Sequence, residues 1–359
     1  MKIAQIAPLW ESVPPVGYGG IELVVSLLTD ELVRRGHEVT LFASGDSQTL
    51  AHLEPGCDRA LRPMGITHKD FAIYEQMQLG KIVARSHQFD LIHSHLIYAA
   101  VPYANLIKTP IIHTLHWIME PVMEMFFQQH QQQNYISISN SQRRPELGLN
   151  YIDTVYNSIP IDRFTFHPEP ENPPYLAFLG RMSESKGPHL AIEIAKRTGL
   201  PLKMAGKVDL FNQEFYETKV EPLIDNDQIQ CVGEITSQEK NDLLGGAIAT
   251  LFPIQWREPF GLVMTESMAC GTPVIATNFG AAPEVVADGE TGFICEDIDS
   301  CVAAIDKLPS LSRQACRERV QNHFSVSRMV DNYEAVYRRI LAEGFAKNGR
   351  SLESEFAGN

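Results

Sequence analysis

The sequence predicts an α/β protein built from two doubly wound parallel-sheet domains. Short apolar segments typical of buried strands alternate with segments of helical periodicity along most of the chain. Loops rich in glycine or polar residues follow several of these strands, and a stretch with four prolines, residues 166–174, divides the series in two. With 359 residues the chain is long enough for each domain to bury its own core. Sheets of this kind bind ligands at the carboxyl ends of their strands.

Composition narrows the classes of function. The chain has 44% hydrophobic and 21% charged residues, as ordinary globular proteins have, and its formal net charge of -14 argues against a nucleic-acid partner. It has no run of about 18 apolar residues and opens directly on a strand rather than a signal peptide, so we expect a cytoplasmic protein without integral membrane association. The six cysteines include no C-x-x-C pair, which predicts reduced, mostly buried thiols rather than a zinc ribbon or a disulfide framework.

The first domain opens with a strand, a glycine loop, a helix and a second strand. We expect the strands at residues 2–7 and 39–43, and the helix at 21–35, where apolar side chains recur at helical spacing. The glycine loop at 17–20 lacks both the G-x-G-x-x-G spacing and the G-K-[ST] of a P-loop. Two interpretations stay open: a tight turn, or a flexible loop whose backbone approaches a phosphate, since glycine lets the main chain come close.

Four histidines lie on or after two later strands of this domain. We expect further strands at residues 90–95, 111–115, 135–139 and 152–156, and helices at 71–86, 101–108 and 121–133. The histidines are His93, His95, His113 and His116. Their H-x-H and H-x-x-H spacings can chelate zinc, but no obvious carboxylate or thiolate completes a site, so we favour polar strand ends, with His116 facing the cleft between the domains.

The helix expected at 121–133 carries a stripe of methionine and phenylalanine. A surface helix packed by its apolar face explains this stripe best. The alternative is a face that contacts an acceptor or a membrane, although interfacial helices usually carry Lys and Arg and this one has none.

The second domain begins with a strand at 175–179 and a helix at 188–197, joined by a loop that contains Arg181 and Lys186. Two cations at the end of a strand and ahead of a helix N-terminus predict an anion site in this acidic chain; a solvated charged loop is the alternative. Further strands are expected at 202–205, 228–232, 249–252 and 293–294, and helices at 262–270, 298–308 and 327–341. Thr236 and Glu239 have the spacing of a capping box for one more helix.

The stretch 256–280 joins a strand, a polar loop and a helix. Glu258 lies in the loop and Glu266 about one turn into the helix, whose free N–H groups suit an anion. A phosphate repels a carboxylate beside it. We therefore expect both carboxylates to accept hydrogen bonds from hydroxyls, which sugars and riboses carry.

Motifs in these loops extend the argument to a family. They are E-P-F-G-L-V-M-T-E from Glu258, A-C-G-T-P-V-I-A from Ala269, G-A-A-P-E-V-V-A-D-G-E-T-G-F from Gly280 and G-R-x-S-x-x-K-G from Gly180. Together they closely resemble the retaining family 4 glycosyltransferases, which transfer a sugar from a nucleotide-sugar donor. The resemblance implies the GT-B fold, in which two Rossmann-like domains face a cleft, with the donor held mainly by the second domain and the acceptor by the first. Ser158 departs from the family motif, which commonly has glycine there.

The proline-rich stretch predicts the boundary between the domains, and the resemblance implies the role of each domain. The acceptor-side domain would span residues 1–168 and the nucleotide-sugar-binding domain 169–325. A last helix, 326–342, would cross back to the first domain. The polar residues 343–359 are expected to form a disordered tail.

Transferred position by position, the resemblance assigns roles to individual residues. Arg181 and Lys186 would hold the donor diphosphate and stabilise the charge on the departing nucleotide. Glu266 would accept hydrogen bonds from the ribose hydroxyls, Glu258 would contact the transferred sugar, and His116 would reach in from the first domain. Further positions would act through the backbone or border the base: Gly19 and Gly20 near the phosphate, Val232 and Gly233 near the base, and the N–H groups of Phe260, Gly261 and Leu262 near sugar and phosphate.

The chemistry follows from charge. Breaking the bond between a sugar and a diphosphate builds negative charge on the diphosphate, so two cations and a helix N-terminus form the expected electrostatic catalyst, without a dedicated metal or cofactor. The resemblance favours front-face attack over a covalent carboxylate intermediate. We expect a hexosyltransferase with a UDP-sugar donor, GDP- and ADP-sugars being the alternatives, and an unidentified sugar, lipid or small-molecule acceptor. A sugar-nucleotide epimerase and a non-catalytic nucleotide-sugar-binding subunit are the competing interpretations.

Overall fold

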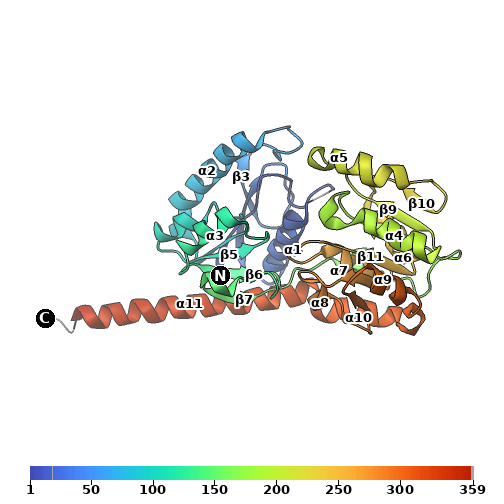
Figure 1. Cartoon of the computed structure of the whole chain (residues 1–359). Helices are drawn as coiled ribbons and strands as arrows, with labels where there is room; N and C mark the ends of the chain where they lie inside the picture. Colours follow the sequence, from blue (N-terminus) through green and yellow to red (C-terminus); the bar gives the residue numbers. More distant parts are fainter. Residues whose placement is uncertain (18, 357–359) are drawn as a thin grey trace. The chain divides into compact units, whose positions relative to one another are not determined.

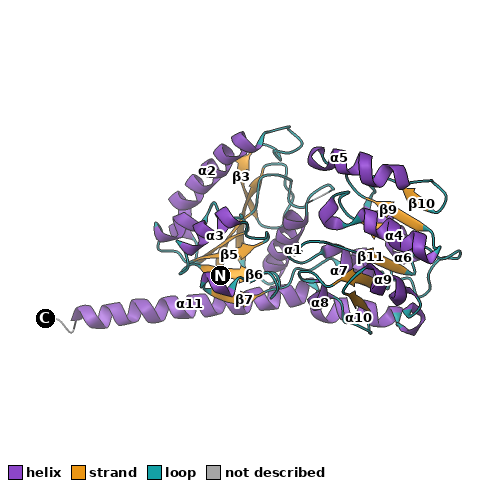
Figure 2. Ribbon diagram, in the orientation of Figure 1, coloured by secondary structure: helices purple, strands orange, loops and turns teal. Residues whose placement is uncertain are grey.

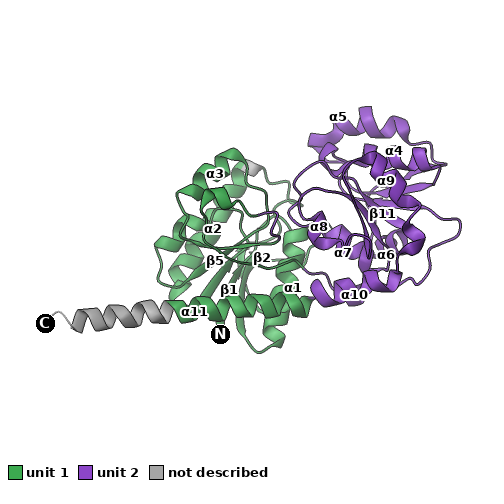
Figure 3. Cartoon of the chain, turned by 60° about the horizontal axis from the view of Figure 1, so that its bottom comes forward, with its two compact units in different colours: residues 1–138, 143–157, 326–359 green, residues 139–142, 158–325 purple. Residues whose placement is uncertain are grey.

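The computed structural model describes the backbone of residues 1–17 and 19–356, and the side chains of these residues apart from 68 and 344–356. The chain forms two compact units. Unit 1 comprises residues 1–138, 143–157 and 326–359, and unit 2 comprises 139–142 and 158–325 (Figure 3). Each unit has its own parallel sheet with helices packed against it, which confirms the predicted fold class (Figures 1 and 2).

The sheet of unit 1 has seven parallel strands in the order β3-β2-β1-β4-β5-β6-β7. The strands are β1 (Lys2–Ile6), β2 (Glu38–Ser44), β3 (His52–Cys57), β4 (Leu91–Ser94), β5 (Ile111–Leu115), β6 (Asn134–Ser137) and β7 (Tyr151–Thr154). The main helices in the first half of the chain are α1 (Gly20–Arg34), α2 (His68–Arg85) and α3 (Pro121–Gln128). Strands β4 and β5 are buried along their whole length, as parallel strands covered on both faces are.

The predicted helix over 121–133 is shorter in the structure, where α3 ends at Gln128. Its apolar stripe is divided between core and surface. Phe127 is fully buried in a cluster with Leu115 and Tyr135, whereas Val122 and Met125 are exposed. The prediction that the apolar stripe packs against the protein therefore holds for one side of this helix only.

The sheet of unit 2 has six parallel strands in the order β10-β9-β8-β11-β12-β13. The strands are β8 (Leu176–Leu179), β9 (Leu202–Ala205), β10 (Ile229–Cys231), β11 (Ala249–Phe252), β12 (Val274–Thr277) and β13 (Gly292–Cys295). The helices are α4 (Pro188–Thr198), α5 (Gln213–Phe215), α6 (Ser237–Gly246), α7 (Leu262–Ala269), α8 (Ala282–Val285), α9 (Ile298–Ile305) and α10 (Arg313–His323). Because the strand order changes direction at β8, the loops after β8 and β11 lie at a topological switch point, where open α/β sheets bind ligands.

Helix α6 begins at the capping box that the sequence predicts. The Thr236 hydroxyl accepts from the backbone N–H of Glu239 at 3.3 Å, and the Glu239 carboxylate accepts from the N–H of Thr236 at 2.7 Å. Two otherwise unpaired N–H groups of the first turn are satisfied in this way.

The last helix, α11 (Val326–Phe356), packs on unit 1. Val330, Tyr333 and Tyr337 are buried in one cluster with Val24 and Leu28 of α1. Val330, Tyr333 and Tyr337 are spaced three and four residues apart, so they lie on one face of the helix.

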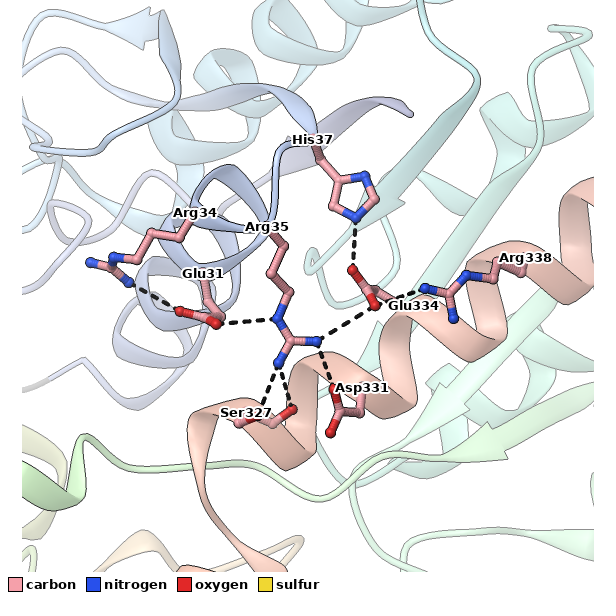
Figure 4. A network of polar contacts seen from close by, with 8 residues as sticks. All are labelled: Glu31, Arg34, Arg35, His37, Ser327, Asp331, Glu334 and Arg338. Atoms are coloured by element: carbon pink, nitrogen blue, oxygen red, sulfur yellow. Dashed lines mark hydrogen bonds and ion pairs between the residues drawn. The ribbon is translucent and has the colours of Figure 1, made fainter.

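A polar network borders this apolar contact between α1 and α11 (Figure 4). The Arg35 guanidinium donates to Asp331 at 2.6 Å and to the Ser327 hydroxyl at 3.0 Å, and a His37 ring nitrogen lies 2.8 Å from the Glu334 carboxylate. Glu334 also forms an ion pair with Arg338 at 2.9 Å. The final helix is thus held by both apolar burial and ion pairs.

The division between the units differs from the predicted boundary at residue 168. Residues 158–168 belong to unit 2, because their backbone is bonded there: the Thr165 N–H donates to Asn241 and the His167 N–H donates to the carbonyl of Cys270, both at 2.9 Å. The short segment 139–142 also belongs to unit 2, since the N–H groups of Asn140 and Ser141 donate to Glu284 at 2.7 Å. The proline-rich stretch therefore lies inside the second unit.

The tail also differs from the prediction. Helix α11 continues through Phe356, where we expected a disordered segment from Glu343, and residues 357–359 lie outside the described residues. The segment contains two glycines, which weaken a helix, but no proline, which would break one, so the helix can continue through it. In the described part of the chain no helix combines the length and the apolar character that crossing a bilayer requires.

Candidate functional site

The candidate site in unit 2 is built from the two loops at the switch point. The loop after β8 carries Arg181 and Lys186, and the loop after β11 carries Glu258. The two loops touch: the N–H of Gln255 donates to the carbonyl of Ser185 at 3.0 Å, and a side chain at Gly187 would overlap the carbonyl of Pro253. Gly187 also has φ +71°, a conformation that favours glycine. The G-R-x-S-x-x-K-G motif thus ends in glycine for a steric reason.

Lys186 and Glu258 form an ion pair inside this loop cluster. Their side chains are 18% and 10% exposed, and the Lys186 ammonium lies 4.9 Å from the centre of the Trp256 ring. A pair this shielded from water is held more firmly than a surface pair, and the aromatic face adds a cation–π attraction. The sequence predicted both residues for the site but not that they would contact each other.

Gly280 fixes the position of Glu258. It has φ +56°, and a side chain there would overlap the backbone N and O of Glu258. The carbonyl of Glu258 accepts from the N–H of Ala281 at 2.9 Å. The glycine that begins the third motif therefore allows the loop after β12 to support the loop after β11.

Glu266 lies in α7 and pairs with Lys240 of α6. The lysine Nζ is 2.7 Å from the glutamate oxygen, and the carboxylate side chain is only 8% exposed. Lys240 was not a predicted site residue. It lies four residues after the Thr236 cap, and nothing in its local sequence distinguishes it from the other charged residues of that helix.

Arg181 has one weak ion-pair partner and one unused donor. Its Nη1 lies 3.5 Å from Asp209 in the loop after β9, and its Nε is buried without a hydrogen-bond partner among the described residues. An unsatisfied guanidinium donor in a loop at the switch point suits an anionic or polar ligand. Arg181 thus contacts neither of the two predicted carboxylates.

The loops after β8, β9 and β10 also lie against each other. The N–H of Gly206 donates to the carbonyl of Gly233 at 2.8 Å, and a side chain at Gly206 would overlap the carbonyl of Gly180. Val232, which precedes Gly233, is 60% exposed. Val232 and Gly233 therefore border the loop of Arg181, at the edge where the resemblance places the base.

Helix α7 begins without a side-chain cap. Gly261 occupies the N-cap position with φ +81°, and no acidic residue lies in the first turn. The Phe260 side chain is 2% exposed, so it is not suited to contact a ligand. The start of this helix presents N–H groups and the positive end of the helix dipole.

Unit 1 carries the remaining predicted residues. His116 follows β5, is 7% exposed, and has its Nε2 atom 2.9 Å from Nδ1 of His95. Burial lowers the pKa of His116 to about 3, so the ring is neutral at physiological pH. A neutral imidazole offers one donor and one acceptor.

Gly19 and Gly20 lie at the start of α1. A side-chain carbon at Gly19 would come within 2.7 Å of Pro15 and 3.2 Å of a Glu22 oxygen. The loop is therefore packed at this position, which favours the tight-turn interpretation. Helix α1 begins at Gly20 with no side-chain cap.

Glu22, in the first turn of α1, is a site feature that the sequence analysis missed. Its side chain is buried, and burial raises the pKa of its carboxyl to about 7. No local sequence pattern marks Glu22 as buried, because its burial depends on the neighbouring loop.

Replacing Glu22 with glutamine is expected to flatten the pH dependence of stability. The folded pKa of about 7 lies above the ordinary value of 4.5, so the unfolded chain loses this proton first and the free energy of unfolding falls as pH rises between these values. Urea titrations at several pH values should show that the free energy of unfolding decreases less with rising pH in the variant than in the natural protein. The exposed Glu38→Gln variant is the control and should follow the natural protein; parallel curves for all three proteins would contradict the assignment.

The zinc interpretation of the four histidines is not favoured by their contacts. His93 lies 2.8 Å from the Tyr337 hydroxyl and 2.7 Å from the Thr114 hydroxyl. Both ring nitrogens of His113 are buried without a hydrogen-bond partner among the described residues. Over the described residues, no group of three or more His, Cys, Asp or Glu side chains is placed to hold a metal ion.

Comparison with known proteins identifies the class of protein. The family model described as Glycosyltransferase Family 4 matches residues 18–159, and the model described as Glycosyl transferases group 1 matches residues 162–323. A glycogen synthase from Mycobacterium tuberculosis is 25% identical over 90% of this chain and 91% of its own length.

Two solved structures share the fold. Sucrose-phosphate synthase from Thermosynechococcus elongatus has a TM-score of 0.80 at 20% identity and covers 95% of this chain and 99% of its own. HepE from Anabaena, solved with UDP and glucose, has a TM-score of 0.71 at 18% identity, covering 94% and 100%. The two Rossmann-like sheets and these matches define a glycosyltransferase of the GT-B fold. The chain belongs to the family 4 glycosyltransferases, with the group 1 domain as its second half.

Proposed function

We propose that this protein is a retaining hexosyltransferase that moves a sugar from a UDP-sugar to an acceptor hydroxyl. The observation that carries the proposal is the loop cluster at the switch point of unit 2. The cations Arg181 and Lys186 lie in the loop after β8, and α7, which follows the loop after β11, begins without a side-chain cap; positive charge and a free helix start both favour an anion. Unit 2 binds the donor, and unit 1 binds the acceptor.

In the proposed reaction, the bond between the anomeric carbon and the diphosphate oxygen breaks, and its electron pair stays on the diphosphate. The acceptor oxygen bonds to the anomeric carbon from the same face, and its proton passes to the departing phosphate oxygen. Arg181, Lys186 and the N–H groups of residues 260–262 stabilise the charge that develops on the diphosphate. Because side chains and backbone supply this positive charge, the proposal includes no metal or cofactor.

The Lys186–Glu258 ion pair prepares the site for the donor. Glu258 keeps the lysine charge in place in the free protein, where a buried unpaired ammonium would be costly. A diphosphate carries more negative charge than one carboxylate, so it competes for the lysine. Glu258 is then available to accept hydrogen bonds from hydroxyls of the transferred sugar.

The identity of the nucleotide rests on similarity. The HepE structure contains UDP, and the chain shares its fold. UDP is therefore the proposed carrier. The acceptor, whether a sugar, a lipid or another small molecule, is left to a transfer screen.

Replacing Glu266 with alanine is expected to raise KM for the UDP-sugar roughly tenfold to a hundredfold, because hydrogen bonds to a charged group contribute about 1.5–3 kcal/mol. The same variant should lose most of the rise in Tm that UDP gives the natural protein, since a ligand of the folded state stabilises it. Steady-state kinetics and thermal unfolding with UDP, GDP and ADP measure both effects.

The control for Glu266→Ala is Glu290→Ala, which removes an exposed carboxylate of the same unit. If UDP, GDP and ADP all leave the Tm of the natural protein unchanged, the donor site is wrongly assigned. An epimer formed from the nucleotide sugar without any acceptor would instead identify an isomerase.

A further inference from the structure

A chain of buried polar side chains runs through unit 1 from His116 to helix α11. His116 Nε2 lies 2.9 Å from His95 Nδ1, and His95 Nε2 lies 3.0 Å from the Gln5 carbonyl oxygen. The Gln5 amide nitrogen donates to the Tyr337 hydroxyl at 3.2 Å. The chain thus connects the end of β5, the end of β4, the centre of β1 and the last helix.

The chain continues beyond Tyr337. The Tyr337 hydroxyl lies 2.8 Å from His93 Nδ1, and His93 Nε2 lies 2.7 Å from the Thr114 hydroxyl. Thr114 is in turn 3.1 Å from the Tyr333 hydroxyl. Six links therefore join seven side chains, which come from three strands or their ends (β1, β4 and β5) and one helix.

Because the seven side chains are buried, they cannot exchange these hydrogen bonds for contacts with bulk water. His116 is 7% exposed, and the other six side chains of this hydrogen-bonded network are inaccessible to water. Burial lowers the pKa of His116, His95 and His93 below the ordinary value, so all three rings are neutral at physiological pH. Each neutral ring has one N–H and one bare nitrogen, and a link works only if one partner donates and the other accepts.

The Gln5 amide sets the direction of every link. Its oxygen faces His95, so His95 must carry its proton on Nε2 and accept at Nδ1. His116 must then donate from Nε2, which leaves its Nδ1 as an acceptor. On the other side, the Gln5 nitrogen donates to Tyr337, whose hydroxyl donates to His93. Turning the amide over would reverse every link and make Nδ1 of His116 a donor.

We propose that Gln5, His95 and Tyr337 are positioning residues that hold His116 as the Nε2–H tautomer, so that its Nδ1 can accept a hydrogen bond from a hydroxyl of the substrate. The link to substrate rests on the proposed function, whereas the tautomer rests on the contacts alone. A bare ring nitrogen binds a hydroxyl and repels a phosphate oxygen. The ring is therefore prepared for a sugar or acceptor hydroxyl rather than for the diphosphate.

The chain also makes the last helix part of the site. Tyr337 accepts from Gln5, and its hydroxyl is the link that joins the Gln5 amide to His93 and the rest of the network, so removing the hydroxyl frees the amide to adopt either orientation. Tyr333 lies at the far end of the chain, where it only receives the hydrogen bond of Thr114. Two tyrosines one turn apart on α11 therefore have different expected effects on His116.

The test compares Tyr337→Phe with Tyr333→Phe in the full chain. Long-range proton–nitrogen NMR of protein labelled with ¹⁵N-histidine reports which ring nitrogen carries the proton, and a His116→Gln sample assigns the His116 signals. In the natural protein and in Tyr333→Phe we expect one His116 tautomer, protonated at Nε2. In Tyr337→Phe we expect both tautomers, and kcat should fall in proportion to the fraction with Nδ1 protonated.

The outcomes separate this inference from the proposed function. An Nδ1–H tautomer in the natural protein, or a Tyr337→Phe spectrum identical to the natural one, overturns the inference whatever the activity. Absence of sugar transfer by the natural protein overturns the proposed function and leaves the NMR result intact. His113→Leu removes an equally buried histidine whose ring nitrogens have no partner among the described residues, so it should leave the His116 signals in place.

Discussion

Replacing Lys186 with alanine is expected to lower kcat for sugar transfer by about a hundredfold to a thousandfold, because removing one preorganised charge contact costs about 2.7–4 kcal/mol in the transition state. The lysine ammonium is held by Glu258 and by the face of Trp256 before the donor arrives. Its charge is therefore in place when negative charge develops on the leaving group. Steady-state kinetics at saturating UDP-sugar measures the loss.

The matched control is Lys196→Ala, which removes an exposed lysine of α4 in the same unit and should leave kcat unchanged. Lys186→Ala also leaves Glu258 without its partner, so a lower Tm is expected and the assay should run well below it. If kcat of Lys186→Ala equals that of the natural protein, the assignment of Lys186 to the diphosphate is wrong.

Replacing Tyr333 with alanine is expected to lower the free energy of unfolding of unit 1 by about 3–5 kcal/mol, the range for large aromatic side chains removed from a core. Tyr333 is completely buried between α11 and the sheet, in a cluster that includes Ile3 and Ile112. Urea titration measures the loss, and amide hydrogen exchange of β1 assigns it to unit 1.

The control for Tyr333→Ala is Arg338→Ala on the exposed side of the same helix. Arg338 is 66% exposed and pairs only with Glu334 among the described side chains, so its loss should cost less than about 1 kcal/mol. Equal destabilisation by the two variants would mean that α11 is held by its polar network rather than by its buried face.

The sequence predicts that the candidate residues of unit 2 lie at one edge of its sheet, because the signals for them are local. Arg181 and Lys186 follow one apolar strand and Glu258 follows another, and parallel strands bring such loops to one edge of the sheet. Glycines at 187 and 280 mark places where backbones approach each other closely. For these residues the roles assigned by resemblance stay predictions, although their placement at the switch point agrees with them.

The features that were missed depend on contacts between distant residues. Lys186 pairs with Glu258 and Lys240 pairs with Glu266, and no local pattern specifies either partner. No local pattern specifies the contact of His116 with His95 either, or the hydrogen bond from Gln5 to Tyr337. A one-dimensional pattern indicates which face of an element is buried, but not which side chain from another element meets it.

Strand β3 was missed for a different reason. Its sequence contains Pro55 and Gly56, which normally argue against a strand. The structure places β3 at the edge of the sheet, where it pairs only with β2 among the described strands. Proline is tolerated there because an edge strand does not need every N–H group for pairing.

The return of α11 to unit 1 has a consequence for synthesis. The ribosome completes all of unit 2, residues 158–325, before it makes the helix that covers Val24 and Leu28. During translation the first-made half of the chain therefore waits with an uncovered apolar face, although domains usually fold in the order in which they are made. A fragment cut at residue 325 would keep that exposed face. The two units consequently cannot be produced as independent pieces by a single cut.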